Sequence, residues 1–400
     1  MTGTPLSFSP TDPAFLQDPY PTYKRLRDEA PIFFFEPWKK WVLTRHGDVA
    51  ALLRDRRLGR VLENVKVRKN PGHAAFDDVQ DGSLLELEPP DHTRIRAAVQ
   101  DVFTPKHVRA LEGKIARLCD RLAEGLAARP ERRAELLTDY AEPIPVTVIA
   151  ELLGVPEGER YRLVPWSKAI IGMFEPERTP AMEQKAVLAA GEFAAYVREL
   201  IGEKRAAPGD DLISRMVRLH DRDPERLSEH EIVANAILFL DAGHEAVVNV
   251  VGNGAVALLS RPEVWAQLKA HPERLETAVE ETLRFDTPLQ FFERVVREPL
   301  EYGGFTWPRG TRLCLYYASS NRDERVFHDP DTFDPTRSPN PHLSFGLGLH
   351  YCIGAPLARL ELKHAFRALL EHVPDMALTG ATTYQPKNVF RYPAAVPVTY

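Results

Sequence analysis

The residues with the clearest chemical signature lie at 345–359, in the sequence FGLGLHYCIGAPLAR. Cys352 stands among glycines there, with Gly346 and Gly348 before it and Gly354 after it. Glycines let a backbone turn tightly and approach a neighbour closely. A helix is predicted to begin just beyond them, because a proline occupies its first turn. A thiolate at a helix N-terminus is favoured by the helix dipole and is a good metal ligand, so the pattern predicts a metal-binding cysteine. The alternative is an inert cysteine buried in a turn.

Two further motifs place charged side chains where they can pair. The sequence ETLR puts Glu281 and Arg284 one helical turn apart, so both lie on one helix face. The segment FDPTR, residues 333–337, supplies a second arginine, Arg337. A lone pair of this kind is usually solvated, so its meaning depends on the motifs around it.

An apolar run at residues 232–259 is interrupted by Asp241, His244 and Glu245. Asp241 and Glu245 are four residues apart and therefore share one face of the predicted helix. Burial and a neighbouring carboxylate both raise the pKa of a carboxyl group. Asp241 either lines a pocket, where it anchors a polar or cationic substrate group or extends a proton relay, or it bonds a neighbouring element and is structural. His244 is expected to point away and to pack or form hydrogen bonds elsewhere.

The order of these motifs resembles that of the cytochrome P450 family. FGxGxHxCxG followed by LAR is its haem-binding signature, and ExxR and FDPTR precede it. The resemblance implies a mainly α fold with a minor β part, in which a long central helix crosses the haem. It implies a single domain over residues 1–400, with a helix-rich lobe and a small β-rich lobe near the N-terminus. It also implies haem b with Cys352 as iron ligand, held in a loop that Glu281, Arg284 and Arg337 lock.

The resemblance further implies which side chains contact the haem. Three residues that flank the cysteine belong to the signature: Phe345, Gly346 and Gly354. Four side chains match positions that bind the haem propionates: His92, Arg96, Arg294 and His342. Charged donors form the stronger hydrogen bonds to carboxylates, which suits this role.

The long helix matches the family pattern A-G-x-[D/E]-T except at its last position. Ala242, Gly243 and Glu245 fit, and Ala246 stands where the threonine is expected. Gly243 would leave room for dioxygen and loosen the helix, and Glu245 would help to deliver protons. In the family, the threonine hydroxyl positions the proton donor, so Asp241, Glu245, a water or a substrate hydroxyl must replace it here, or peroxide leaks.

The expected substrate pocket is mostly apolar and therefore favours a hydrophobic small molecule. Its predicted lining is Leu238, Ala242, Thr287, Leu289, Phe291 and Phe390. Residues 61–85 and the region around Met173 and Phe174 match variable lids. Each of these side chains could instead belong to the core.

The implied activity is that of a soluble, bacterial-type haem-thiolate monooxygenase, which inserts one oxygen atom of O2 into its substrate by hydroxylation or oxidative dealkylation. The chain has no room for a fused reductase, so electrons would come from a separate ferredoxin or flavodoxin. A basic docking patch is predicted at Lys106, Arg109, Lys114, Arg117 and Arg359, unless these are merely solvated. Two alternatives remain: a peroxide-driven peroxygenase, suggested by Ala246, and a non-catalytic haem-containing ligand-binding protein.

The composition fits this interpretation. The 400 residues carry a formal charge of -6, which argues against a nucleic-acid partner. Three cysteines without paired spacing favour a reducing compartment. No signal peptide and no membrane span are recognisable, so a cytoplasmic, monomeric protein is expected.

The elements that must position these residues are mostly helices. A capping box of Ser228 and Glu231 opens the long helix, and a second one, of Ser260 and Glu263, is expected to open the next. Other helices are predicted near 20–29, 91–101, 106–127, 156–172, 182–205, 271–284 and 355–372. Strands are predicted at 32–36, 40–44, 312–318 and 394–400, and an ordered loop at 321–341.

Overall fold

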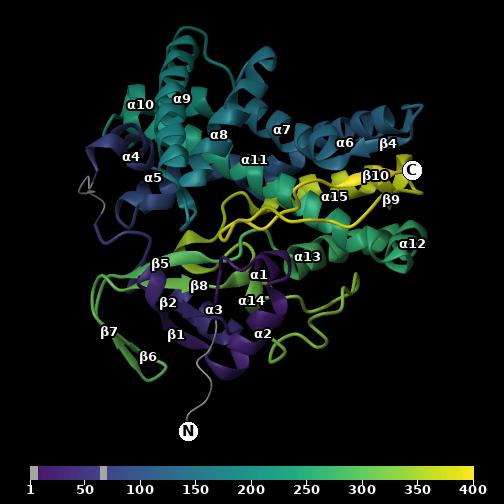
Figure 1. The fold of residues 1–400 in the computed structure, drawn as a ribbon. Helices are drawn as coiled ribbons and strands as arrows, with labels where there is room; N and C mark the ends of the chain where they lie inside the picture. The colour runs from purple at the N-terminus through teal and green to yellow at the C-terminus, as the bar shows by residue number, and fades with distance from the viewer. Residues whose placement is uncertain (1–7, 64–69) are drawn as a thin grey trace.

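The computed structural model describes residues 8–63 and 70–400, and these residues form a mainly helical protein with a minor β part (Figure 1). The predicted fold class is therefore confirmed. The helices are α1 (Pro13–Gln17), α2 (Tyr20–Glu29), α3 (His46–Arg54), α4 (Ala74–Gln80), α5 (Asp91–Val99), α6 (Pro105–Ala127), α7 (Pro143–Leu153), α8 (Leu163–Ile171), α9 (Pro180–Ala206), α10 (Leu212–Arg222), α11 (Glu229–Leu259), α12 (Pro262–Ala270), α13 (Leu275–Phe285), α14 (Tyr317–Ser320) and α15 (Ala355–His372).

The largest sheet has five strands in the order β1-β2-β8-β5-β3. Their bounds are Ile32–Phe35, Lys40–Leu43, Arg312–Leu315, Phe292–Val296 and Leu58–Gly59. Only the β2–β8 pair is parallel among these described strands. Alternate residues of β8 enter different apolar clusters, Leu313 and Leu315 on one face and Cys314 on the other, so the sheet is buried on both faces.

Three further pairs of strands lie away from this sheet. The strands β4 (Arg133–Glu135) and β9 (Ala377–Leu378) both pair with β10 (Pro397–Thr399), and β6 (Leu300–Tyr302) forms a hairpin with β7 (Phe305–Trp307). The C-terminal strand is thus shorter than the one predicted over 394–400, because only three of its residues find a partner strand.

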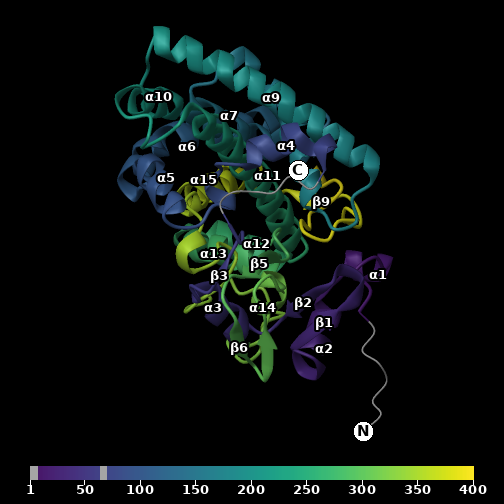
Figure 2. The same cartoon turned by 90° about the vertical axis from the view of Figure 1, so that its left-hand side faces the viewer.

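Helix α11 runs through the middle of the molecule, with α4 to α10 on one side and the five-stranded sheet on the other (Figures 1 and 2). Its predicted capping box is confirmed: Ser228 Oγ accepts from the Glu231 amide at 3.2 Å, and Glu231 accepts from the Ser228 amide at 2.8 Å. The apolar run packs almost all round this helix, since most of its residues are buried.

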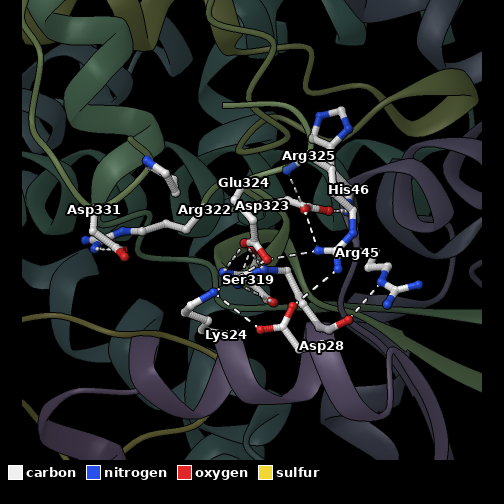
Figure 3. Close-up of polar contacts among 12 residues, drawn as sticks. Lys24, Asp28, Arg45, His46, Ser319, Arg322, Asp323, Glu324, Arg325 and Asp331 are labelled. Carbon is white, nitrogen blue, oxygen red and sulfur yellow. Dashed lines mark hydrogen bonds and ion pairs between the residues drawn. The ribbon is translucent and has the colours of Figure 1, made fainter. Parts of the chain in front are cut away.

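The predicted loop at 321–341 is ordered by ionic contacts to the N-terminal helices (Figure 3). Arg27, buried on α2, donates to the Ser319 carbonyl at 3.0 Å and pairs with Glu324 at 3.1 Å. The His46 amide, at the start of α3, donates to Asp323 at 2.8 Å. The N-terminal helices therefore hold the loop that leads from the sheet to the cysteine motif.

Several predicted elements have different bounds. The Ser260 capping box is wrong: Ser260 ends α11 in helical geometry, and α12 begins at Pro262 after Arg261. The helix predicted from 271 begins at Leu275, after a short 3-10 turn. The strand predicted over 312–318 ends at Leu315, since the chain turns there into α14. No described helix is both long and apolar enough to cross a membrane.

Candidate active site

A cavity of about 330 Å³ lies between α11 and the cysteine loop, which we define as residues 342–354. Its size is in the range of small-molecule sites. It brings together almost all of the side chains singled out in the sequence. The predicted residues that line it are His92, Arg96, Leu238, Asp241, Ala242, Gly243, Glu245, Ala246, Thr287, Leu289, Arg294, Phe345, Gly346, Cys352, Gly354 and Phe390.

The backbone of the cysteine loop is set by two left-handed glycines, Gly346 at φ 65° and Gly348 at φ 73°. A β-carbon at position 348 would lie 2.3 Å from the Leu53 carbonyl oxygen, so only glycine fits where the loop crosses the end of α3. The Cys352 amide donates to the Phe345 carbonyl at 3.0 Å and closes the loop. The thiol therefore faces the cavity from a fixed position.

The electrostatics of Cys352 differ from the simple expectation of a favoured thiolate. Burial raises the pKa of the Cys352 thiol, and this effect outweighs the amides of Gly354 and Ala355 and the positive charges of Arg96 and Arg359, which lower it. The start of α15 thus does not lower the pKa of the thiol below its ordinary value. A bound metal ion would favour the thiolate.

The predicted ion network holds the loop from behind. Arg284 Nε and Nη2 donate to the two carboxylate oxygens of Glu281 at 2.7 Å each, and Arg337 Nε lies 3.1 Å from both oxygens. Arg284 also donates to the carbonyl of Asn321 at 2.9 Å. The Asn321 side chain in turn accepts from the Leu343 amide at 2.7 Å, at the start of the cysteine loop. The sequence motif and the loop are therefore joined by one continuous set of hydrogen bonds.

One part of the cavity is cationic and has unfilled hydrogen-bonding capacity. Arg96 and Arg294 line it, and both ring nitrogens of the buried His92 have no hydrogen-bond partner among the described residues. Burial, with the nearby charges of His350 and Arg96, lowers the pKa of His92 to about 4. Buried donors without acceptors are costly, so this set fits a group that brings carboxylates. The two propionates of haem b are such a group.

Two predicted site residues lie elsewhere. His342 does not line the cavity: its Nε2 pairs with Glu280 at 3.0 Å, outside the pocket. Phe291 is 1% exposed and stacks on Tyr316 with a ring distance of 4.8 Å, so it belongs to the core beside the sheet. Both corrections have the same cause, since the backbone turns these side chains away from the cavity.

His350 is the imidazole that the sequence interpretation missed. It lines the cavity, packs edge-on against His92 with a ring distance of 4.6 Å, and lies 3.0 Å from Glu88. The sequence held a signal for it, because His350 stands two residues before Cys352 inside the same motif.

Parts of the two predicted lid segments line the cavity. Residues 64–69 of the segment 61–85 lie outside the described residues, whereas Val79, Gln80, Leu84 and Leu85 line the cavity. Phe174 lines it as well, but Met173 does not. Apolar side chains from several elements therefore enclose the cavity.

The polar interruption of α11 faces this cavity, with Asp241, Glu245 and Ala246 in its lining. His244 points elsewhere: it is fully buried and lies 3.9 Å from Glu142. The helix is continuous through Gly243, so the expected loosening is absent. A β-carbon at position 243 would lie 3.2 Å from Ile149, so glycine here allows α7 to approach closely.

Glu245 is 5% exposed and its ionisation is shifted. Burial raises the pKa of the Glu245 carboxyl, and this dominates over the nearby charges of Lys387 and Lys168, which lower it. A carboxyl with a raised pKa retains its proton at higher pH than an ordinary one. It can therefore act as a proton donor inside the cavity.

The site has three features of a haem-thiolate oxidoreductase. They are a cysteine just before a helix, cationic donors suited to two carboxylates, and a helix that carries an acidic group across the cavity. Comparison with known proteins agrees. The family model described as Cytochrome P450 matches residues 179–373. Cytochrome P450 monooxygenase PikC of Streptomyces venezuelae is 38% identical over 391 residues, which cover 96% of this chain and 91% of PikC.

Vitamin D(3) 25-hydroxylase of Pseudonocardia autotrophica is 36% identical over 391 residues, covering 96% of this chain and 94% of that enzyme. The crystal structure of P450BioI in complex with hexadec-9Z-enoic acid ligated acyl carrier protein has a TM-score of 0.91 at 33% identity, covering 97% of this chain and 100% of the other. This chain belongs to the cytochrome P450 family and is a monooxygenase with haem b as its cofactor.

Proposed function

We propose that this protein hydroxylates or oxidatively dealkylates a hydrophobic small molecule with O2, using electrons from a separate ferredoxin or flavodoxin and Glu245 as the proton donor. The observation that carries the proposal is the buried Glu245 carboxyl, which lines the cavity directly beside Ala246. Glu245 would hold the proton that the family's threonine normally helps to position.

Each group has a separate task in this scheme. Cys352 would hold the haem iron as a thiolate, and His92, Arg96, Arg294 and His350 would hold the propionates. The bound haem supplies the oxygen chemistry. The apolar lining would exclude bulk water and orient the substrate. This role is assigned to Leu238, Leu289 and Phe390, which lie in the cavity wall.

Proton supply to Glu245 would come from the side of the C-terminal loop. Lys387 is half-buried there, lies close enough to influence the pKa of Glu245, and donates to the Tyr392 hydroxyl at 2.6 Å. A chain of such groups can pass a proton between solvent and a buried carboxyl. The missing hydroxyl at Ala246 would then be replaced by Glu245 together with water or a substrate hydroxyl.

The exposed cations of α6 support a docking surface for an acidic electron donor. Lys106, Arg109, Lys114 and Arg117 are all exposed on this helix. Arg359, which was expected to join them, instead donates to Glu280 at 2.6 Å and 2.9 Å. Lys114 likewise pairs with Glu151, so the proposed surface consists of Lys106, Arg109 and Arg117. The same proposal includes that the protein is a single domain, monomeric and cytoplasmic.

The test compares two supplies of oxidising equivalents on the haem-loaded protein. One arm contains ferredoxin, its reductase, NADPH and O2, and the other contains hydrogen peroxide alone, with a fatty acid, a steroid and an alkylbenzene as probes. Product in the first arm that matches the NADPH consumed supports the proposal. Product in the peroxide arm alone would overturn it in favour of a peroxygenase, and binding without product in either arm would leave a ligand-binding protein.

Two variants separate the role of Glu245 from that of Ala246. Glu245→Gln should lower kcat in the O2 arm by at least about tenfold, since positioned proton donors contribute about 10²-fold or more. Glu245→Asp, which keeps a carboxyl, is its matched control. Ala246→Thr should raise product per NADPH by less than about twofold if Glu245 already serves as the donor. An unchanged kcat in Glu245→Gln would show that another group delivers the protons.

A further inference from the structure

We propose that Asp241 is the recognition group for a protonated amine on an otherwise apolar substrate. This inference rests on the proposed function and names the class of substrate that the cavity takes. It starts from Asp241, which lines the cavity together with Glu245 but has no part in the proposed proton delivery.

Asp241 forms part of the cavity wall. It is 7% exposed, it lines the cavity, and its Oδ1 has no hydrogen-bond partner among the described residues. A buried carboxyl oxygen that accepts no hydrogen bond is costly, because burial removes its hydration without replacing it. A ligand that brings a donor to this position removes that cost.

The two carboxyls of α11 that line the cavity differ in their charged neighbours. The pKa of Glu245 is influenced by the cations Lys387 and Lys168 and by the carboxylate of Glu142. For Asp241, burial raises the pKa of the carboxyl, the Glu245 carboxylate raises it further, and no cation of the described residues offsets them. No described cation thus neutralises Asp241. A cationic ligand would fill this gap.

The polar side chains near Asp241 do not neutralise its charge either. Ser167, on the packed helix α8, is a polar neighbour that lowers the pKa of Asp241, but its hydroxyl forms no hydrogen bond with a described residue. Gln80 of α4 and Thr287 after α13 line the cavity and are uncharged. The cavity's arginines, Arg96 and Arg294, are those assigned to the haem carboxylates. The rest of the lining is mainly apolar, which suits the body of the ligand.

An ammonium and a hydroxyl can be distinguished by proton balance. At a pH below the raised pKa of Asp241, a protonated amine that binds there displaces the proton of the carboxyl to solvent, and the ammonium–carboxylate pair remains. Amine affinity should therefore rise with pH up to the pKa of the free carboxyl. A hydroxyl ligand exchanges no proton, so its affinity would not depend on this group.

The test uses three probes that share a phenylbutyl body and end in dimethylamine, isopropyl or carboxylate. Their binding to the haem-loaded protein is measured by equilibrium dialysis, from about pH 6 to about pH 8, a range in which the amine stays protonated. We expect the amine to bind at least about tenfold tighter than the isopropyl probe at the upper pH, as for a hydrogen bond to a charged group. The carboxylate probe should bind most weakly.

Asp241→Asn should remove this preference and its pH dependence, while the isopropyl probe binds within about twofold of its original affinity. Unchanged isopropyl binding also shows that the variant is folded. Gln80→Leu, which alters a polar lining residue without changing charge, is the matched control and should keep the amine preference. Equal binding of the amine and isopropyl probes in the unaltered protein, or an equal loss of both in Asp241→Asn, would overturn the inference.

Failure of this inference is distinguishable from failure of the proposed function. Turnover of the isopropyl probe with O2 and no amine preference would refute only the role of Asp241. An amine preference that depends on Asp241, without product from any probe, would refute only the monooxygenase proposal for this cavity.

Discussion

Arg284→Leu should be among the most damaging single substitutions outside the cavity. Arg284 and Glu281 are both 0% exposed and share two hydrogen bonds of 2.7 Å. Removing the guanidinium leaves the buried Glu281 carboxylate with Arg337 as its remaining cationic partner. Breaking a buried pair in this way costs about 3–5 kcal/mol. Because backbone carbonyls also lose their donor, at about 1 kcal/mol each, the free energy of unfolding should fall by an amount near the upper end of that range.

The matched control is Arg325→Leu in the same part of the chain. Arg325 pairs with Asp28, Asp323 and Glu324 at 3.0–3.2 Å, but its side chain is 43% exposed (Figure 3). The buried Asp323 keeps two donors in the variant, the backbone amides at positions 46 and 325, so it is not left without partners. Exposed pairs contribute about 0–1 kcal/mol, so this variant should stay within about 1 kcal/mol of the original. Urea unfolding of the haem-loaded protein, followed by far-UV circular dichroism and by haem absorption, measures both. Equal unfolding free energies for the two variants would refute the reasoning that burial decides the cost.

Two further predictions concern the cysteine loop. Gly348→Ala should lower the melting temperature and the haem content, because its β-carbon would clash with the Leu53 carbonyl oxygen. The control is Gly304→Ala, at φ 84° with open space around it, which should cost only the backbone strain of about 1–3 kcal/mol. Burial alone would raise the pKa of Glu280, but hydrogen bonds from His342 and Arg359 lower it to about 2 from 4.5. Its charge therefore adds stability above about pH 4.5 that is lost as the pH falls toward about 2. Glu280→Gln should flatten this part of the acid-unfolding curve, and an unchanged curve would show that other carboxyls dominate.

The parts of the fold that could be predicted are those whose signal is local. The capping box of α11 and the bounds of α15 follow from side chains within one turn of the helix ends, and both predictions are confirmed. The same reasoning failed at Ser260, because a serine with a glutamate three residues later does not reveal whether the preceding helix has ended. Helix α7 was missed because Pro143 and Pro145 suggest a break, although a helix tolerates proline in its first turn.

The residues of the site also fall into two groups, those with a local sequence signal and those without one. Cys352 and the pair of Glu281 and Arg284 are fixed by short motifs, so the sequence was sufficient to place them in one site. His342 and His350 stand in the same loop, and sequence alone could not tell which imidazole turns toward the cavity. That choice depends on the left-handed turns of the loop and on two distant carboxylates, Glu280 and Glu88, each of which holds one of the histidines.

The two proposals for α11 are linked through distance along the helix. Asp241 lies about 6 Å before Glu245 and about 7.5 Å before Ala246, at a rise of 1.5 Å per residue. A substrate held by an amine at Asp241 would therefore have its apolar body over Ala246, in the space that a threonine side chain would otherwise share. Under the two proposals, a small residue at this position would favour binding of the anchored substrate, and Glu245 would supply the proton. Ala246→Thr should accordingly weaken binding of the amine probe more than that of the isopropyl probe, and equal effects on both probes would show that Asp241 and Glu245 act independently.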